Sequence, residues 1–288
     1  MINEIKERIE SKKIFRAMAA HNPLSAKLAE EAGFNGIWAS GFELSATYGI
    51  PDASLISMTQ HLDNTRAIAA QVKVPIIADI DTGYGNAVNV MHAVSAYEKA
   101  GAAAVVMEDK KFPKDTSLLE GGRQDLVSIA HFQGKIEAAT AARRAPQFTV
   151  IARTEAFIAG QGLEEALKRA HAYAEAGADM ILVHSKAKTP DEILSFLDVW
   201  ESKTPIVLVP TNYPELTEAR MKESGKVGVV IYGNHAIRAA VYAMQEIFAT
   251  IRRDGGIHNI DSRIAPLKEI FRLQGLAETK ENEKQFVR

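Results

Sequence analysis

Short apolar runs rich in β-branched residues alternate with longer amphipathic segments along most of this 288-residue chain. The apolar runs predict eight strands, at residues 14–20, 36–40, 75–81, 104–109, 148–154, 180–185, 205–210 and 228–234. Amphipathic stretches at residues 24–32, 57–72, 163–176 and 190–200 predict helices between several of these strands. Strands that alternate with helices indicate a parallel sheet whose strands are joined by crossover helices.

The junction between helix and strand recurs. Four predicted helices end in the glycine expected at a left-handed C-terminal cap, at Gly33, Gly101, Gly177 and Gly225. Seven residues after the first three glycines stand Ser40, Glu108 and His184, polar residues that close apolar strands. Eight strand–helix units over about 260 residues predict an α/β fold, the (β/α)8 or TIM barrel. A doubly wound open sheet is the alternative, but no glycine-rich dinucleotide motif follows the first strand.

We expect residues 1–288 to form a single barrel domain. Residues 110–125 are expected to form an active-site gating loop, called the gate below, and residues 254–288 a C-terminal helical extension. A helical pattern at 241–253 is followed by a glycine break and a second helical pattern at 264–273. The apolar residues of the second helix would pack on a neighbouring subunit or on the chain's own barrel. The charged residues 277–288 are expected to be a solvated or frayed end.

Composition narrows the class of protein. An apolar content of 47% rules out a disordered chain. With 34 basic and 36 acidic residues the net charge is -2, which makes nucleic acid an unsuitable partner. No apolar stretch approaches the eighteen or so residues of a membrane span. The absence of cysteine excludes thiolate chemistry, suits a cytoplasmic location, and restricts any metal to oxygen or imidazole ligands.

Polar side chains gather where the predicted strands end, and in a barrel these ends meet at one mouth. The set consists of Ser40, Asp79, Asp81, Glu108, Asp109, Arg153, Glu155, His184, Ser185, Thr211, Asn234 and His235. Half-buried carboxylates are costly unless they are paired or bound to metal. The whole set therefore indicates an active site.

Three carboxylates meet in this set. Asp79 and Asp81 lie two apart on one predicted strand and would share a face, and Glu108 ends the neighbouring strand. A hard divalent ion, most simply Mg²⁺, would offset their repulsion, and Asp52 offers a fourth oxygen. The alternative is that the two aspartates cap the helix that follows.

Positive charge is expected opposite the acids. Arg153 and His184 close two strands, and Lys114 lies on the gate. An arginine fork with a nearby histidine suits a carboxylate or phosphoryl group. A structural ion pair between Arg153 and Glu155 is the alternative, although residues two positions apart on one strand do not make an ideal ion pair. The gate itself is either a closing lid or a solvated connection.

These motifs together resemble the phosphoenolpyruvate mutase and isocitrate lyase superfamily, and within it the phosphonopyruvate hydrolase branch. The resemblance covers nearly the whole chain and rests on segments 38–41, 79–85, 108–110, 112–114, 151–153, 183–185, 209–211 and 233–235. The carbon–carbon lyases of the superfamily carry a cysteine on the gate, and this chain has none. The mutases typically carry asparagine where this chain has Thr116, and the hydrolases carry threonine.

The resemblance implies roles for individual residues. Asp79 would bind Mg²⁺ directly, with Mn²⁺ or Co²⁺ as substitutes, and Asp52, Asp81 and Glu108 would reach the metal through water. Ser40, Gly41 and Phe42 would bind the pyruvyl end of the substrate, and Arg153 and His184 would bind the phosphonyl group. Lys114, Thr116 and Ser117 would act from the gate. The assembly would be a homo-oligomer, a dimer or a tetramer, in which the eighth helix swaps between subunits.

The implied activity is Mg²⁺-dependent hydrolysis of the carbon–phosphorus bond of phosphonopyruvate, a small 2-oxo acid phosphonate, to pyruvate and phosphate. The bond breaks to leave a pyruvate enolate stabilised by the metal. Thr116 would either orient the attacking water or accept the phosphoryl group itself. The alternatives are phosphoenolpyruvate mutase, then an oxaloacetate hydrolase or a 2-methylisocitrate-type lyase, and last a barrel without catalytic activity.

Overall fold

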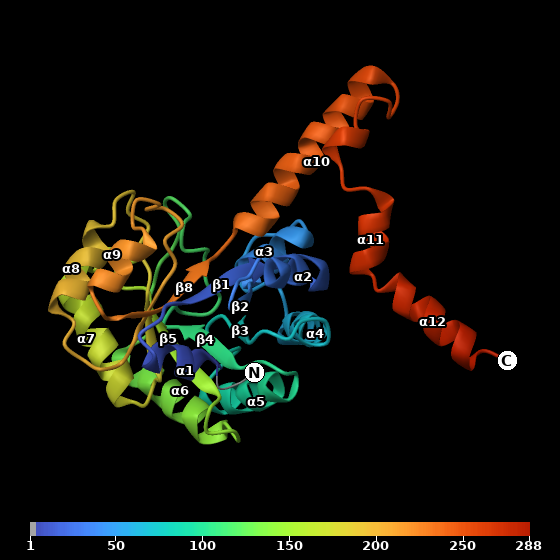
Figure 1. The fold of residues 1–288 in the computed structure, drawn as a ribbon. Helices are drawn as coiled ribbons and strands as arrows, with labels where there is room; N and C mark the ends of the chain where they lie inside the picture. The colour runs from blue at the N-terminus through green and yellow to red at the C-terminus, as the bar shows by residue number, and fades with distance from the viewer. Residues whose placement is uncertain (1–3) are drawn as a thin grey trace. The chain divides into compact units, whose positions relative to one another are not determined.

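Eight parallel strands close into a barrel in the computed structural model, which describes residues 4–288 (Figure 1). The strands are β1 Phe15–Ala20, β2 Gly36–Ala39, β3 Ile76–Asp79, β4 Ala104–Glu108, β5 Thr149–Thr154, β6 Met180–Val183, β7 Ile206–Leu208 and β8 Val227–Tyr232. Each strand pairs with the next, and β8 pairs with β1, where Phe15 lies opposite Val229. The predicted TIM barrel is confirmed, and closure excludes the doubly wound open sheet.

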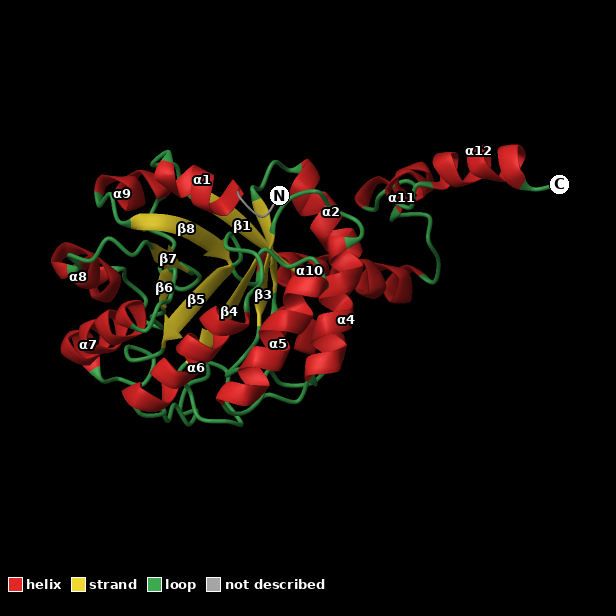
Figure 2. Cartoon of the chain, turned by 90° about the horizontal axis from the view of Figure 1, so that it is seen from below, coloured by secondary structure: helices red, strands yellow, loops and turns green. Residues whose placement is uncertain are grey.

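Helix α1 Glu4–Glu10 precedes β1, and its Ile5 belongs to the cluster that fills the barrel interior. The helices that connect the strands lie outside the ring (Figure 2): α2 Pro23–Glu31, α3 Gly41–Thr47, α4 Met58–Ala69, α5 Ala87–Lys99, α6 Ile129–Ala142, α7 Gly162–Glu175, α8 Asp191–Val199 and α9 Glu218–Glu223. The predicted glycine junctions are confirmed, because Gly33, Gly101 and Gly177 follow the ends of α2, α5 and α7 at φ between 85° and 98°. A side chain is strained in that conformation, which explains the choice of glycine.

The core has two layers because successive side chains of a strand point to opposite sides. One layer lies between strands and helices, where Val150 of β5 and Val94 of α5 belong to the same buried cluster. The other fills the barrel interior and includes five residues that stand two positions before a polar strand-end residue: Trp38, Ile77, Val106, Ile151 and Leu182. This alternation directs the polar residues to the mouth of the barrel.

The chain forms two compact units, and the second runs from Ala236 to Arg288. Its helices are α10 His235–Asp254, which begins one residue before the boundary, a short 3-10 helix Asp261–Arg263, α11 Leu267–Leu273 and α12 Leu276–Phe286. Of the two alternatives for 277–288, the solvated end agrees with the structure and the frayed end does not, because most of this segment is the exposed helix α12. Over residues 4–288, none of the helices combines the length and the apolar character needed to cross a membrane.

Candidate active site at the carboxyl end of the barrel

Five strands each place one polar side chain above the barrel interior. These residues are Ser40, Asp79, Glu108, Arg153 and His184, and each follows by two positions a residue of the interior cluster. All five are at least nine-tenths buried, so their charges and hydroxyls are held away from bulk water. The predicted convergence of the strand ends is thus confirmed for these residues.

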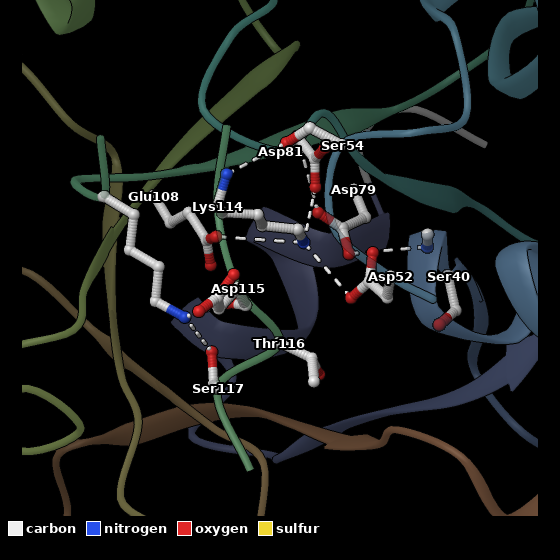
Figure 3. A network of polar contacts seen from close by, with 12 residues as sticks. Ser40, Asp52, Ser54, Asp79, Asp81, Glu108, Lys114, Asp115, Thr116 and Ser117 are labelled. Atoms are coloured by element: carbon white, nitrogen blue, oxygen red, sulfur yellow. Dashed lines mark hydrogen bonds and ion pairs between the residues drawn. The ribbon is translucent and has the colours of Figure 1, made fainter. Parts of the chain in front are cut away.

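The ammonium of Lys114 lies among the carboxylates (Figure 3). Its Nζ is 3.2 Å from Asp52 Oδ2 and 3.8 Å from Glu108 Oε1, and it forms an ion pair with Asp81. The expectation that Lys114 stands opposite the acids with Arg153 and His184 is therefore wrong. The gate folds inward and carries the lysine across to the acidic side.

Asp81 reaches this cluster from a turn and not from the strand. β3 ends at Asp79, and Asp81 has a left-handed backbone with φ of 54°, a conformation that aspartate tolerates better than most residues. The expectation that both aspartates share one face of one strand is wrong for Asp81. The alternative role as helix caps also fails, since Asn86 caps α5 through the amides of Val88 and Asn89.

Burial and mutual repulsion shift the titration of the acidic side. Burial, with repulsion from Asp81, Asp79 and Glu108, raises the pKa of Asp52 to about 6, although Lys114 acts to lower it. Burial also raises the pKa of Asp79. The surrounding acids hold the pKa of Lys114 well above its usual range despite its burial. The lysine therefore stays charged and partly neutralises the cluster.

The acidic donor set fits a hard divalent cation. Its ligand atoms are carboxylate oxygens, and Glu108 Oε1 is buried without a hydrogen bond. Within residues 4–288, however, no group of three or more acidic or histidine side chains is arranged to hold a metal ion. The Lys114 ammonium lies where the carboxylates converge, so a metal would have to compete with it for the same oxygens.

The opposite side of the mouth is organised around Arg153. Its Nε donates to Glu155 Oε1 at 2.5 Å, and its Nη2 donates to His184 Nδ1 at 2.8 Å. The alternative pair with Glu155, which seemed unfavourable on one strand, is therefore formed. The reason is that β5 ends at Thr154, so Glu155 lies outside the regular alternation of the strand.

The protonation of His184 follows from its neighbours. Burial and the adjacent Arg153 lower the pKa of His184, which favours the neutral ring. A guanidinium nitrogen can only donate, so Nδ1 accepts from Arg153 and Nε2 carries the proton. Nδ1 is also 3.1 Å from Glu155 Oε1, a contact that becomes a hydrogen bond only if the ring is protonated. The neutral tautomer is the one the structure favours.

The gate is an ordered projection with a short antiparallel base. Lys110 bridges Leu126, and the Lys111 amide donates to the Asp125 carbonyl at 2.9 Å. Further along, the Gln124 side chain donates to the Thr116 carbonyl at 3.2 Å. These bonds order the gate, and its role as a closing lid stays a prediction.

The gate covers a cavity of about 70 Å³ at the mouth. The cavity is lined by Trp38, Ser40, Phe42, Asp52, Asp79, Lys114, Thr116, Ser117, Leu118, Arg153, His184, Val209, Thr211, Gly233 and Asn234. Most predicted site residues are therefore brought together. The predicted residues outside this lining are Gly41, Asp81, Glu108, Asp109, Glu155, Ser185 and His235. The Gly41 amide faces Asp79 Oδ2 at 3.4 Å, and Asp109 instead pairs with Arg169 of α7 at 3.0 Å.

Two buried residues beside the cavity had no assigned role in the reaction, although Glu155 belongs to the predicted strand-end set. Glu155 contacts Arg153, His184 and Ser117, and Lys110 contacts Glu155 and the gate. Both had a signal in the sequence, because each is a charged residue within two positions of the end of a buried strand. The apolar lining residues Leu118 and Val209 gave no such signal.

Comparisons with known proteins identify the family. Residues 5–252 match the protein family described as phosphoenolpyruvate phosphomutase. A phosphonopyruvate hydrolase of Variovorax sp. (strain Pal2) is 63% identical over 271 residues, which cover 94% of this chain and 93% of that protein.

Two crystal structures are similar over the full length of the chain. One is a phosphonopyruvate hydrolase in complex with oxalate and Mg²⁺, with 58% identity, a TM-score of 0.94 and complete coverage of both chains. The other is a phosphoenolpyruvate phosphomutase from Streptomyces platensis subsp. rosaceus, with 49% identity, a TM-score of 0.97 and coverage of 100% and 99%. Backbone similarity does not separate hydrolase from mutase here, whereas sequence identity favours the hydrolase. The predicted family resemblance is confirmed, and the chain belongs to the phosphoenolpyruvate phosphomutase family.

Proposed function

We propose that this protein is a Mg²⁺-dependent phosphonopyruvate hydrolase. It cleaves the carbon–phosphorus bond of phosphonopyruvate and releases pyruvate and phosphate. The observation that carries the proposal is a single buried cavity with carboxylates at one side, Arg153 and His184 at the other, and the hydroxyl-bearing Thr116 in its lining. The 63% identity to a phosphonopyruvate hydrolase supports the same activity.

The acidic side is assigned to the metal. We assign Asp79 as the direct ligand of Mg²⁺, with Asp52, Asp81 and Glu108 as partners that reach it through water. Mn²⁺ or Co²⁺ would suit the same oxygen donors. When bound, the metal supplies positive charge beside the carbonyl oxygen of the substrate. The Lys114 ammonium, which lies on the gate, supplies a second positive charge at this side of the cavity.

The pyruvyl end of the substrate is assigned to the start of α3. The Ser40 hydroxyl accepts from the Glu43 amide at 3.1 Å, which fixes its position at the mouth. Ser40, Gly41 and Phe42 would receive the carboxylate and carbonyl on one hydroxyl and on backbone amides. The Gly41 amide would exchange its long contact with Asp79 for the substrate.

The phosphonyl end is assigned to Arg153, His184 and Ser117. The guanidinium is held by Glu155, and the neutral His184 ring carries its proton on Nε2, so both can donate to phosphonyl oxygens. As the carbon–phosphorus bond breaks, its electron pair stays on carbon as the enolate, which then takes a proton to become pyruvate. The phosphoryl group is transferred to water, directly or by way of the Thr116 oxygen, and these donors neutralise it during transfer.

The mutase is the main alternative reaction, in which the phosphoryl group returns to the enolate oxygen. Thr116 supports the hydrolase because a hydroxyl can orient water or accept the phosphoryl group, whereas an amide is a poor nucleophile. Lyase chemistry of the kind that uses a gate cysteine lacks its acid in this chain.

The oligomer is part of the same proposal. Helix α10, in the second compact unit, exposes four large apolar side chains: Val241, Tyr242, Met244 and Phe248. Exposed apolar surface of this kind suits a homo-oligomer, a dimer or a tetramer, with the eighth helix swapped between subunits. Sedimentation would measure the assembly. The assignment of residues 1–288 to one barrel domain with an extension, and the cytoplasmic location, stay predictions.

The metal requirement provides the first test. Removing divalent ions with a chelator is expected to abolish phosphate release from phosphonopyruvate, because the carboxylate cluster then has no metal ion to stabilise the enolate. Adding Mg²⁺ in excess is expected to restore the full rate. The measurement is phosphate release with and without chelator, and full activity in excess chelator would overturn the metal assignment.

The anion side has its own test in Arg153→Lys. A point ammonium cannot reproduce the fork that donates to Glu155, Ser117 and His184 at once. We expect kcat/KM for phosphonopyruvate to fall by about a hundredfold. Near-normal kinetics for the variant would place Arg153 in a structural role.

A further inference from the structure

Lys110 is a buried cation that the proposed reaction does not use. It lies two residues after the end of β4 and is 1% exposed. Its Nζ donates to the Asp115 carbonyl at 2.8 Å and to Ser117 Oγ at 2.7 Å. These two partners flank Thr116 on the gate, so one ammonium fixes the chain on both sides of the residue that separates hydrolase from mutase.

The position of Lys110 is itself fixed by Glu155. Its Nζ lies 3.2 Å from Glu155 Oε2, and that carboxylate is completely buried. Ser117 Oγ donates to the same Oε2 at 2.5 Å. Because a buried charge needs partners, the ammonium cannot move away without losing its contacts with Glu155, Ser117 and the Asp115 carbonyl.

The same carboxylate reaches the anion-binding side. Glu155 Oε1 accepts from Arg153 Nε at 2.5 Å, and Arg153 Nη2 donates to Ser117 Oγ at 2.9 Å. The gate segment is therefore tied to the phosphonyl-binding residues by side chains that are already in place. A gate that carried Thr116 elsewhere would break these bonds.

We propose that Lys110 is a positioning residue that acts through Asp115 and Ser117 to hold Thr116 over the phosphonyl group. The inference rests on the proposed function. A different role, in which Lys110 only neutralises Glu155, would act on Arg153 and His184 and would not depend on Thr116. The two roles differ in what happens when Thr116 is absent.

A double-mutant cycle tests the proposal. Lys110→Met keeps length and bulk but removes the donors, and it is expected to lower kcat by about a hundredfold, the scale of a misplaced catalytic group. In the Thr116→Ala background the same change is expected to lower kcat by no more than about threefold, because coupled residues are not additive. Equal losses in both backgrounds would overturn the proposal.

Two further measurements show that the variants remain folded. Oxalate binding in the presence of Mg²⁺ is expected to stay near the parent value, and thermal unfolding is expected to remain cooperative, with a lower midpoint in Lys110→Met because Glu155 loses a buried partner. Asp179→Asn is the matched control, since Asp179 is a half-buried carboxylate that pairs with Arg143 at 2.6 Å outside the site. Its variant is expected to lose stability without a change in kcat. If Lys110→Met does not fold, Lys110→Arg enters the same cycle, because a guanidinium cannot reproduce the two short contacts of the ammonium.

Hydrogen exchange separates failure of this proposal from failure of the proposed function. The amides of residues 115–117 are expected to exchange at least about tenfold faster in Lys110→Met, whatever substrate the enzyme uses. If the parent protein does not hydrolyse phosphonopyruvate, the proposed function is wrong. The exchange rates at residues 115–117 still test the positioning role of Lys110 in that case. Unchanged exchange at these amides would overturn the positioning role.

Discussion

Asp79→Ala is expected to abolish both metal binding and phosphonopyruvate hydrolysis. Asp79 ends β3, its carboxylate is almost fully buried, and it is the acid that we assign to direct contact with Mg²⁺. Loss of even a supporting partner of a metal ligand typically costs about 10–100-fold in affinity. Loss of the charged ligand itself should exceed that range.

Calorimetric titration of the metal-free protein with Mg²⁺ measures this effect without relying on activity. Asp63→Ala is a suitable control, because Asp63 is an exposed acid on α4 that pairs with Arg66 and has no part in the site. Parent-like Mg²⁺ affinity in Asp79→Ala would contradict the metal assignment. Weak binding in both variants would point to a general effect of net charge.

Thr116→Ala is expected to lower the rate of hydrolysis by about a hundredfold or more, the scale of losing one positioned catalytic group. Thr116 lines the cavity, and its neighbours Asp115 and Ser117 are both held by Lys110. Oxalate should bind with little change, because it would occupy the pyruvyl half of the site near Ser40.

Ser117 carries a neighbouring hydroxyl that can partly replace that of Thr116, so the double change Thr116→Ala with Ser117→Ala belongs beside the single one. Thr116→Ser keeps the hydroxyl and should retain most of the activity. Phosphate and pyruvate release by single-turnover kinetics gives the comparison. Parent rates in both alanine variants would remove any chemical role for the threonine.

Much of the site could be predicted from the sequence because the barrel makes strand ends converge. The two-residue period of a strand places Asp79 above Ile77 and Glu108 above Val106. An apolar run that ends in an acid therefore predicts that the acidic side chain points into the mouth of the barrel. The fold follows from the same alternation of strands and helices. These features depend on local pattern alone.

What the sequence could not predict depends on backbone and loop geometry. Asp81 leaves the strand through a left-handed turn, and Glu155 lies just beyond β5, so the spacing of two does not mean a shared strand face in either case. The path of the gate decides that Lys114 crosses to the acidic side. No local signal reports such a crossing.

The products formed from phosphonopyruvate test the central claim most directly. Purified protein with Mg²⁺ and phosphonopyruvate, followed by phosphorus and proton NMR, would report phosphate, pyruvate and phosphoenolpyruvate in one sample. Hydrolysis predicts phosphate and pyruvate in equal amounts, with no accumulation of phosphoenolpyruvate. Accumulation of phosphoenolpyruvate with little phosphate would contradict the hydrolase and identify the protein as a mutase.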